Sequence, residues 1–266
     1  MSFDEVYDSY INDRIEEKLN NNREELDREL IKPIRLTNCY TNSVNIAVGR
    51  QRTGKTYTII KEIIKICNVH PETHLFIYVN QSGRCQDDTM EAMKSLIKCD
   101  VVYVSENDFV DFIQEILRWK ELYNTIKDQH LEDEIIDEQK QQLFDILHIN
   151  DFDRRWLHTL ILLEDCAKSK LLTNEKSFTN QLLTKCGHIQ CSFFLAVQYW
   201  KALNSNIKAN VSTIFIFAGF SRQQLAYILY QTNLPYSFNE IYEQYKHLSN
   251  HEKMIVDSYG GNLRFA

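Results

Sequence analysis

The chain has 266 residues, of which 44% are apolar and 25% are charged, and its formal net charge is −7. These fractions exclude collagen-like, disordered and disulfide-scaffold proteins, and they fit a globular protein large enough for one large domain or two small ones. The acidic balance argues against a protein that coats nucleic acid with its whole surface, although a local basic loop can still contact phosphate.

Neither a secretory signal nor a membrane span is predicted. The N-terminus, MSFDEVYDSYIND, lacks a basic start, and no apolar run reaches the roughly 18–20 residues of a membrane helix. The seven cysteines have no CxxC spacing, which fits reduced thiols. We therefore expect a soluble intracellular protein.

Residues 4–32 predict a helix, because Leu and Ile recur at intervals of three or four in a charged segment that stops at Pro33. From residue 44 onward, apolar runs of strand length alternate with helical patterns. The expected strands are 44–48, 74–80, 100–105, 158–163, 191–198 and 211–218, followed by a C-terminal hairpin that turns at Gly260-Gly261. The expected helices are 54–67, 88–97, a charge-rich stretch over 107–148, 178–185, 222–231 and 238–247, with a short turn around 202–209.

Strands that alternate with helices predict an α/β fold with a mostly parallel central sheet covered on both faces. We expect an N-terminal helical segment over 1–36 and one domain over 37–266, with 107–148 as a helical insertion. The insertion is interpreted as either an ordinary helical addition or a docking surface.

The segment VNIAVGRQRTGKTYTIIKEII contains the phosphate-loop pattern Gly49-x4-Gly54-Lys55-Thr56, after an apolar strand and at the start of a helix. The glycines let successive N–H groups point at the phosphates, and the helix N-terminus adds partial positive charge. Lys55 offers an ammonium to the phosphates, and Thr56 offers a hydroxyl to Mg²⁺. The predicted ATP-binding residues are Gly49, Arg50, Gln51, Arg52, Thr53, Gly54, Lys55 and Thr56. The two arginines are unusual in such a loop, and they either point to solvent or contact nucleotide or a neighbouring subunit.

A carboxylate pair is expected near the metal. The apolar strand in HTLILLEDC ends in Glu164-Asp165, and adjacent residues at a strand end project in different directions. One carboxylate can hold hydrated Mg²⁺ while the other acts on water, and the sequence leaves these two roles interchangeable. The next strand, CSFFLAVQ, ends in Gln198, whose amide can orient water or sense the γ-phosphate. The predicted catalytic residues are Glu164, Asp165 and Gln198, and the predicted metal ligands are Thr56, Glu164 and Asp165.

The order of these elements resembles the FtsK–HerA superfamily of P-loop NTPases, and within it the viral genome-packaging ATPases of the poxvirus type. The resemblance runs over residues 44–217 and is carried by VGRQRTGKT, LILLED, LLTKCGHIQCSFFLAVQ and NIKANVSTIFIF. It implies a RecA-like (ASCE) three-layer sandwich. The residues that match further family positions are His188, Gln198, Lys208 and Asn210.

Three departures from the family pattern stand out. Gly187 replaces the family arginine beside His188, arginines replace small residues in the phosphate loop, and the acidic pair is Glu then Asp instead of Asp then Glu.

By resemblance, the chain is an ATP-hydrolysing motor that uses ATP and Mg²⁺ to translocate double-stranded DNA into a preformed capsid. The resemblance also implies a ring of five or six copies, a capsid or virion membrane protein as a further partner, and a location at the virus assembly site in the host cytoplasm or in the virion. In such rings an arginine from the adjacent subunit completes each site. The candidates are Arg84, Arg154, Arg155 and Arg222.

Two other functions stay open at this point. A HerA-like helicase or translocase would share the same site and differ in its partner proteins. A nucleotide-dependent switch or scaffold that turns over poorly is also compatible with the inverted Glu-Asp pair and with Gly187.

Overall fold

The computed structural model describes residues 41–68, 74–84, 87–133, 135–152, 157–166, 169–230, 232, 234–258 and 260–266. The helix expected over 4–32 and the whole helical segment expected over 1–36 lie outside these residues, as do Arg154 and Arg155. None of the described helices combines the length and the apolar character needed to cross a bilayer.

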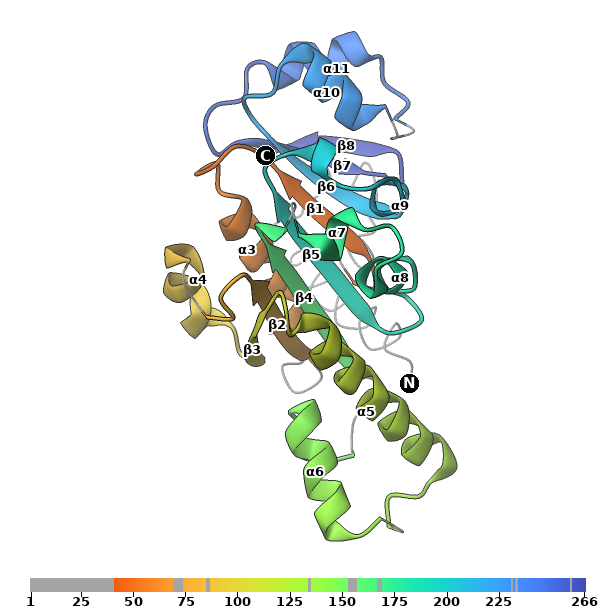
Figure 1. Cartoon of the computed structure of the whole chain (residues 1–266). Helices are drawn as coiled ribbons and strands as arrows, with labels where there is room; N and C mark the ends of the chain where they lie inside the picture. Colours follow the sequence, from red (N-terminus) through yellow and green to blue (C-terminus); the bar gives the residue numbers. More distant parts are fainter. Residues whose placement is uncertain are drawn as a thin grey trace, which may run out of the picture.

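Strands and helices alternate along the chain (Figure 1). The strands are β1 (Val44–Val48), β2 (His74–Asn80), β3 (Asp100–Ser105), β4 (His158–Glu164), β5 (Cys191–Val197), β6 (Val211–Phe217), β7 (Lys253–Asp257) and β8 (Asn262–Phe265). The helices are α3 (Lys55–Cys67), α4 (Asp88–Met93), α5 (Phe109–Gln129), α6 (Asp137–Leu147), α7 (Lys170–Thr173), α8 (Phe178–Thr184), α9 (Ser205–Ala209), α10 (Arg222–Leu229) and α11 (Phe238–Tyr245), with 3₁₀ turns η2 (Lys94–Leu96) and η4 (Trp200–Ala202).

The strands form one sheet in the order β3-β2-β4-β5-β1-β6-β7-β8. The first six are parallel, whereas β7 and β8 add an antiparallel hairpin at one edge. Strand β5 lies between β1, which leads into the phosphate loop, and β4, which carries the acidic pair. The mostly parallel α/β sheet predicted from the sequence is thereby confirmed.

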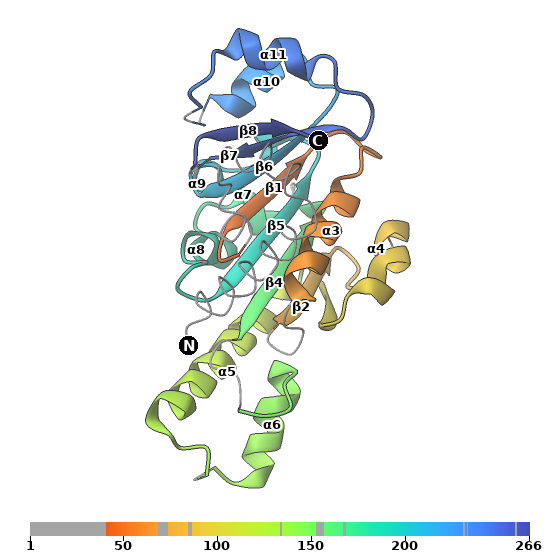
Figure 2. The ribbon, with the colours of Figure 1, turned by 180° about the vertical axis from the view of Figure 1, so that it is seen from behind.

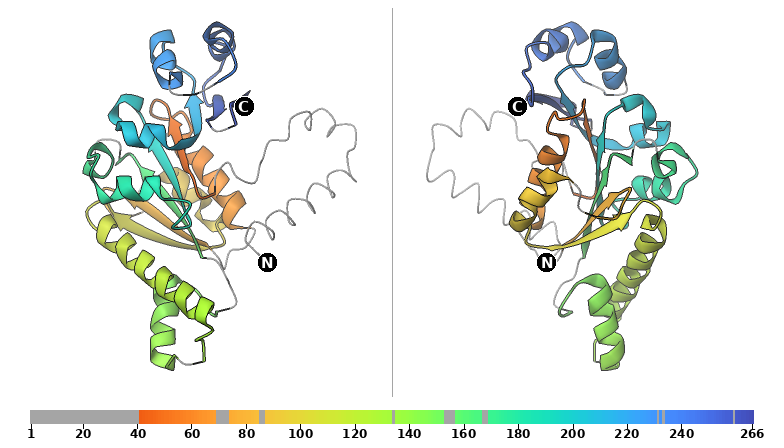
Figure 3. Two further views of the ribbon diagram at one scale, coloured as in Figure 1. Left: turned by 90° about the vertical axis from the view of Figure 1, so that its right-hand side faces the viewer. Right: turned by 60° about the vertical axis from the view of Figure 1, so that its left-hand side comes forward.

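Helices cover both faces of the sheet (Figures 2 and 3). Alternate residues of β4 show this directly, since Leu160 and Leu162 pack in the core beneath α3 and α4, whereas Ile161 and Leu163 pack in the core beneath α5 and α7 to α10. All four are fully buried. A strand buried on both faces reads as a continuous apolar run, and the structure is the predicted three-layer sandwich.

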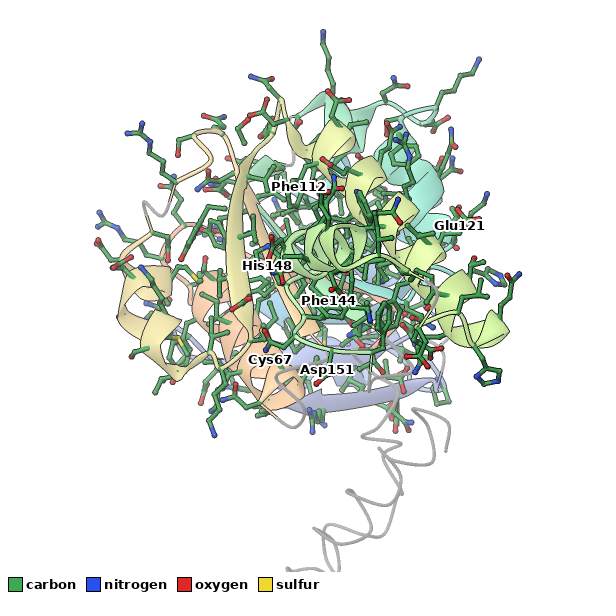
Figure 4. All side chains as sticks on the ribbon, turned by 90° about the horizontal axis from the view of Figure 1, so that it is seen from below. Cys67, Phe112, Glu121, Phe144, His148 and Asp151 are labelled. Atoms are coloured by element: carbon green, nitrogen blue, oxygen red, sulfur yellow. The ribbon has the colours of Figure 1, made fainter. Side chains whose placement is uncertain are left out.

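The charge-rich stretch over 107–148 forms two helices, α5 and α6, that extend below the sheet (Figures 1 and 4). They enclose a small core of their own, in which Tyr123 stacks on Phe152 at 5.5 Å between ring centroids. Lys120 of α5 is buried, and its Nζ donates to Thr159 Oγ1 at 3.2 Å and to the carbonyl oxygen of Ile189 at 2.9 Å. The ammonium therefore ties the insertion to the amino ends of β4 and β5.

Helices α7 and α9 were not anticipated, because four and five residues are too short to show a helical period. The segment expected as a turn around 202–209 is η4 followed by α9. One side chain connects this region: Asn204 Oδ1 accepts from the N–H of Ile207 at 3.0 Å, and its Nδ2 donates to Leu172 O at 2.6 Å and to Asn180 Oδ1 at 2.9 Å. Asn204 thus caps α9 and joins it to α7 and α8.

Replacing Asn204 by Ala removes the cap of α9 and leaves the carbonyl of Leu172 without this donor. We expect Asn204→Ala to lower the free energy of unfolding by about 2–3 kcal/mol, measured by urea denaturation. The matched control is Asn206→Ala, two residues further along at an exposed position, which should stay within about 0.5 kcal/mol of wild type. Equal stabilities for the two variants would contradict the bridging role.

Candidate functional site

The phosphate loop joins the end of β1 to the start of α3, and two glycines determine its path. The N–H of Gly49 donates to Val197 O of β5 at 3.2 Å. A Cβ at Gly49 would lie 2.7 Å from Thr53 Oγ1 and 2.8 Å from the Cβ of Phe217, so only glycine fits. Gly54 has φ +92° and precedes α3, whose first turn is capped by no side chain of the described residues. The N–H groups of that turn are therefore available to an anion.

Lys55 is almost completely buried within the loop that it follows. Its Nζ donates to Arg50 O at 2.9 Å, and the same carbonyl accepts from Thr53 Oγ1 at 2.9 Å. Burial lowers the pKa of Lys55, and the negative charges of Asp165 and Glu164 oppose that shift. A bound phosphate would add further negative charge beside this ammonium.

Thr56 and Glu164 meet across the sheet. Thr56 Oγ1 donates to Glu164 Oε1 at 2.8 Å, whereas Glu164 Oε2 is buried and has no hydrogen-bond partner among the described residues. Burial raises the pKa of Glu164 to about 8; the hydrogen bond from Thr56 opposes this shift, and the charges of Asp165 and Asp87 add to it. The carboxyl group thus keeps its proton at neutral pH in the nucleotide-free protein.

These two side chains fit a magnesium ion. Within the described ranges, no group of three or more His, Cys, Asp or Glu side chains could hold a metal. Mg²⁺ does not require such a group at a nucleotide, because it takes one or two protein oxygens together with phosphate oxygens and water. The hydroxyl of Thr56 and the buried, unpartnered oxygen of Glu164 are ligands of that type.

Asp165 and Gln198 form a second pair beside the first. The strand ends at Glu164, and Asp165 takes φ +51°, so that its carboxylate is exposed while that of Glu164 is buried. Gln198 follows β5, and its Nε2 donates to Asp165 Oδ1 at 3.4 Å. The structure therefore brings together the glycine loop, Lys55, Thr56, both carboxylates and Gln198 at the carboxyl edge of the sheet.

The arginines of the loop are both exposed. The guanidinium of Arg50 lies against Gly219, whose added Cβ would be 3.6 Å from Arg50 Nε, and Arg52 adopts φ +61°. Arg50 thus contacts the connection from β6 to α10 and does not project freely from the loop.

Three residues that match the family pattern lie away from this cluster. His188 is exposed and precedes the first residue of β5, and Asn210 precedes the first residue of β6. Lys208 belongs to α9, also before β6. Strands of seven residues separate these positions from the carboxyl edge, which is roughly 20 Å of chain.

One neighbour of the phosphate loop was missed in the sequence. His251 lies in the connection from α11 to β7 with φ +74°, and its Nδ1 would be 3.5 Å from a Cβ built on Gly54. A histidine in a polar turn carries no local signal for this position. Its approach to the loop depends on the pairing of β7 with β6, which places that turn at the carboxyl edge.

Comparison with known proteins identifies the fold. No protein-family model matches the sequence, and no curated protein matches it. Among solved structures, the genome packaging NTPase B204 of Sulfolobus turreted icosahedral virus 2, in complex with AMPPCP, is 14% identical with a TM-score of 0.51, over 84% of this chain and 96% of that chain. The DNA-packaging ATPase B204 of Sulfolobus turreted icosahedral virus is 15% identical with a TM-score of 0.51, over the same shares.

A secretion ATPase is similar as well. The cytoplasmic domain of the type VII secretion ATPase EccC of Thermomonospora curvata is 15% identical with a TM-score of 0.53, over 84% of this chain and 25% of that chain. At these identities the similarity establishes a shared fold. The chain has the α/β P-loop NTPase fold of these ATPases, as the sequence predicted.

The protonated state of Glu164 has a measurable consequence for stability. Between its ordinary pKa of 4.5 and about 8, the unfolded chain loses this proton while the folded protein keeps it. The free energy of unfolding should therefore fall with rising pH across that window, by up to about 1.4 kcal/mol per pH unit from this group, and level off above it. The Glu164→Gln variant has no titrating carboxyl at this position, so its free energy of unfolding lacks this dependence on pH.

We expect the stability of Glu164→Gln relative to wild type to grow with pH up to about 8 and then to stay constant. The measurement is urea denaturation of both proteins at several pH values, without nucleotide and in the presence of a chelator. The amide can also change the free energy of unfolding by an amount that does not depend on pH, and this amount does not affect how the difference between the two proteins varies with pH. A difference that does not change with pH would show that Glu164 is ionised in the folded protein.

Proposed function

We propose that this protein is an ATP-hydrolysing motor that translocates double-stranded DNA into a preformed viral capsid. The observation that carries the proposal is the contact between Thr56 and Glu164 beside an uncapped glycine loop, with Asp165 and Gln198 adjacent. ATP and Mg²⁺ would be the cofactors, and the site of action would be the host cytoplasm or the virion.

Each side chain has a distinct role in this mechanism. The loop from Gly49 to Gly54 binds the phosphates through main-chain N–H groups, and Lys55 neutralises them with its ammonium. Thr56 and Glu164 would hold Mg²⁺, which when bound offsets charge on the phosphates. This requires Glu164 to lose its proton.

The remaining pair acts on water. The carboxylate of Asp165 is exposed at the edge of the site, where it can accept a proton from the attacking water. The amide of Gln198 can orient that water, because it already contacts the same carboxylate. The geometry thus favours Glu164 for the metal and Asp165 for the water, two roles that the sequence left interchangeable.

The choice of DNA as cargo is supported by the extent of the similarity. The chain spans 96% of the viral genome-packaging NTPase but only a quarter of the EccC cytoplasmic domain. The similarity therefore extends over nearly the whole of the packaging protein, whereas it covers only one part of the EccC domain. A capsid or virion membrane protein would be a further partner, and several copies, five or six, would form a ring around the DNA.

The first test is ATP hydrolysis with and without long duplex DNA. We expect Lys55→Ala to weaken nucleotide binding at least about tenfold, because the phosphates lose their ammonium. Glu164→Gln and Asp165→Asn should keep nucleotide binding and lose about 10²-fold or more in turnover. Glu91→Gln, an exposed carboxylate on α4, is the matched control and should behave as wild type.

Full hydrolysis by both carboxylate variants would contradict the assigned roles. Slow hydrolysis that duplex DNA does not stimulate would favour a nucleotide-dependent switch or scaffold. Stimulation by DNA without any capsid partner, together with strand separation, would favour a helicase of the HerA type.

A ring also needs an arginine from the neighbouring copy, and the structure separates two of the candidates. Arg222 lies over the rings of Phe238 and Tyr242, at 5.5 and 5.2 Å from their centroids, and its Nη2 donates to Asn239 Oδ1 at 2.5 Å. Arg222 therefore holds α10 against α11. Arg84 is exposed, and its guanidinium forms no hydrogen bond or ion pair with the described residues.

The side chain of Asn80 makes most of the hydrogen bonds that order the loop carrying Arg84. Asn80 Oδ1 accepts from the N–H groups of Ser82 and Gly83, and Asn80 Nδ2 donates to Arg84 O at 2.7 Å. The loop follows β2, two strands beyond β5 and away from β1. This position suits contact with the nucleotide of an adjacent copy, so we assign the trans arginine to Arg84.

We expect Arg84→Ala to lower turnover by about 10³-fold or more while nucleotide affinity stays unchanged, because transition-state charge is no longer neutralised. Mixing Arg84→Ala with Lys55→Ala should restore part of the activity, since each Lys55→Ala copy still offers Arg84 to its neighbour. Arg222→Ala should lower stability with little effect on turnover per folded protein. Normal turnover by Arg84→Ala would exclude this assignment.

A further inference from the structure

The acidic net charge of the chain hides a strongly basic segment. Between Asp165 and Glu240 the only acidic residue is Glu175, although the chain as a whole has 37 Asp and Glu against 30 Lys and Arg. The same segment holds seven basic residues: Lys168, Lys170, Lys176, Lys185, Lys201, Lys208 and Arg222. The surface charge is therefore divided between parts of the chain, which neither the net charge nor the pI reveals.

The fold gathers this segment on one side of the sheet. Helices α7, α8 and α9 lie next to one another on the face opposite α3 and α4 (Figure 3), and Asn204 joins all three. Five lysines of these helices and their connections form what we call the basic face. They are Lys170, Lys176, Lys185 and Lys201, which are exposed, and Lys208, which is half-buried.

The lysines of the two sides are paired differently. On the α3 and α4 side, two of the four exposed lysines are paired, Lys65 with Glu62 at 2.9 Å and Lys94 with Glu91 at 3.6 Å. No lysine of the basic face forms an ion pair with any described residue. Its ammonium groups are thus not neutralised by the described part of the chain and can meet an external anion.

Tyr227 of α10 fixes two of these ammonium groups in one place. The Nζ atoms of Lys201 and Lys208 lie 5.5 and 5.6 Å from the centroid of its ring, and the tyrosine is 44% exposed. Cation–π attraction holds both charges close to an accessible aromatic side chain. Two lysines from different elements therefore form one pre-arranged positive site.

We infer that the basic face binds the phosphate backbone of duplex DNA and, in a ring of copies, lines the channel around it. This inference rests on the proposed function. Backbone contacts need positive charge but no base-reading module, and a few lysines per copy are multiplied by the ring. The acidic remainder of the surface repels DNA, so that the duplex is directed to this face.

The basic face also follows directly from the nucleotide site along the chain. Asp165 is five residues before Lys170, and Gln198 is three residues before Lys201. Both residues that contact each other at the carboxyl edge thus lead immediately into lysines of the basic face. Only a few residues of the chain therefore connect the Asp165–Gln198 contact to lysines that would bind the DNA.

The test compares two fourfold variants with equal loss of charge. In the first, Lys170, Lys176, Lys185 and Lys201 are replaced by Gln. In the control, four exposed lysines of α3, η2 and the connection from η2 to β3 are replaced by Gln, namely Lys61, Lys65, Lys94 and Lys98. Neither set includes a residue of the nucleotide site. Binding of a fluorescent duplex of about 40 base pairs is measured by anisotropy between roughly 50 and 200 mM salt, with a nonhydrolysable ATP analogue.

We expect the basic-face variant to lose at least about tenfold in DNA affinity at low salt, and its salt dependence to flatten by up to about 0.9 in log–log slope per lysine removed. The control variant should stay within about twofold of wild type, and both should keep wild-type ATPase activity without DNA. Equal losses in the two variants, or wild-type affinity in the basic-face variant, would overturn the inference.

Two further outcomes separate this inference from the proposed function. If wild type hydrolyses ATP but does not bind duplex DNA at all, the DNA motor fails, and the basic face with it. If wild type binds DNA but the basic-face variant only fails to assemble, as seen by sedimentation, then the face binds the acidic surface of a second copy and the inference is wrong.

Discussion

The proposed nucleotide site depends on one hydrogen bond, between Thr56 and Glu164, which are 108 positions apart in the chain. The bond forms because β1 and β4 run parallel with β5 between them and end at the same edge of the sheet. The other oxygen of Glu164 is buried without a partner among the described residues, and burial raises the pKa of that carboxyl against the effect of the hydrogen bond from Thr56. The buried oxygen without a partner thus lowers the stability of the folded protein at the place where a cation and phosphates would bind, which is common at functional sites.

Features that depend on neighbouring residues in the chain could be predicted from the sequence. Features that depend on how separate segments pair or end in the fold could not. The run VNIAV, followed by glycines at fixed spacing, is sufficient to place β1, the loop and α3. By contrast, the difference between Glu164 and Asp165 arises where the strand ends and Asp165 adopts a positive φ, and no residue type at that position signals it. His251 reaches Gly54 only through the pairing of β7 with β6.

Charge illustrates the same limit at a larger scale. A net charge of −7 argues correctly against a surface that is basic throughout, but it averages an acidic insertion with a segment that has one acidic residue in more than seventy. The sequence contains this division, since the lysines between Asp165 and Glu240 can be counted. Only the fold adds that α7, α8 and α9 share one side of the sheet, and that Lys201 and Lys208 meet at Tyr227.

In the proposed motor, the direction of two strands would connect the hydrolysis site to the DNA-binding face. The two residues of the proposed water-activating pair come directly after strands, Asp165 after β4 and Gln198 after β5. At 3.4 Å the hydrogen bond between them is long, so a water or phosphate oxygen that competes for the amide would displace it. Beyond each strand end the chain enters the basic face, where Asn204 holds α9 to α7 and α8. Because Asn204 uses both its amide oxygen and its amide nitrogen in these contacts, a displacement at either strand end would be expected to move α7, α8 and α9 together.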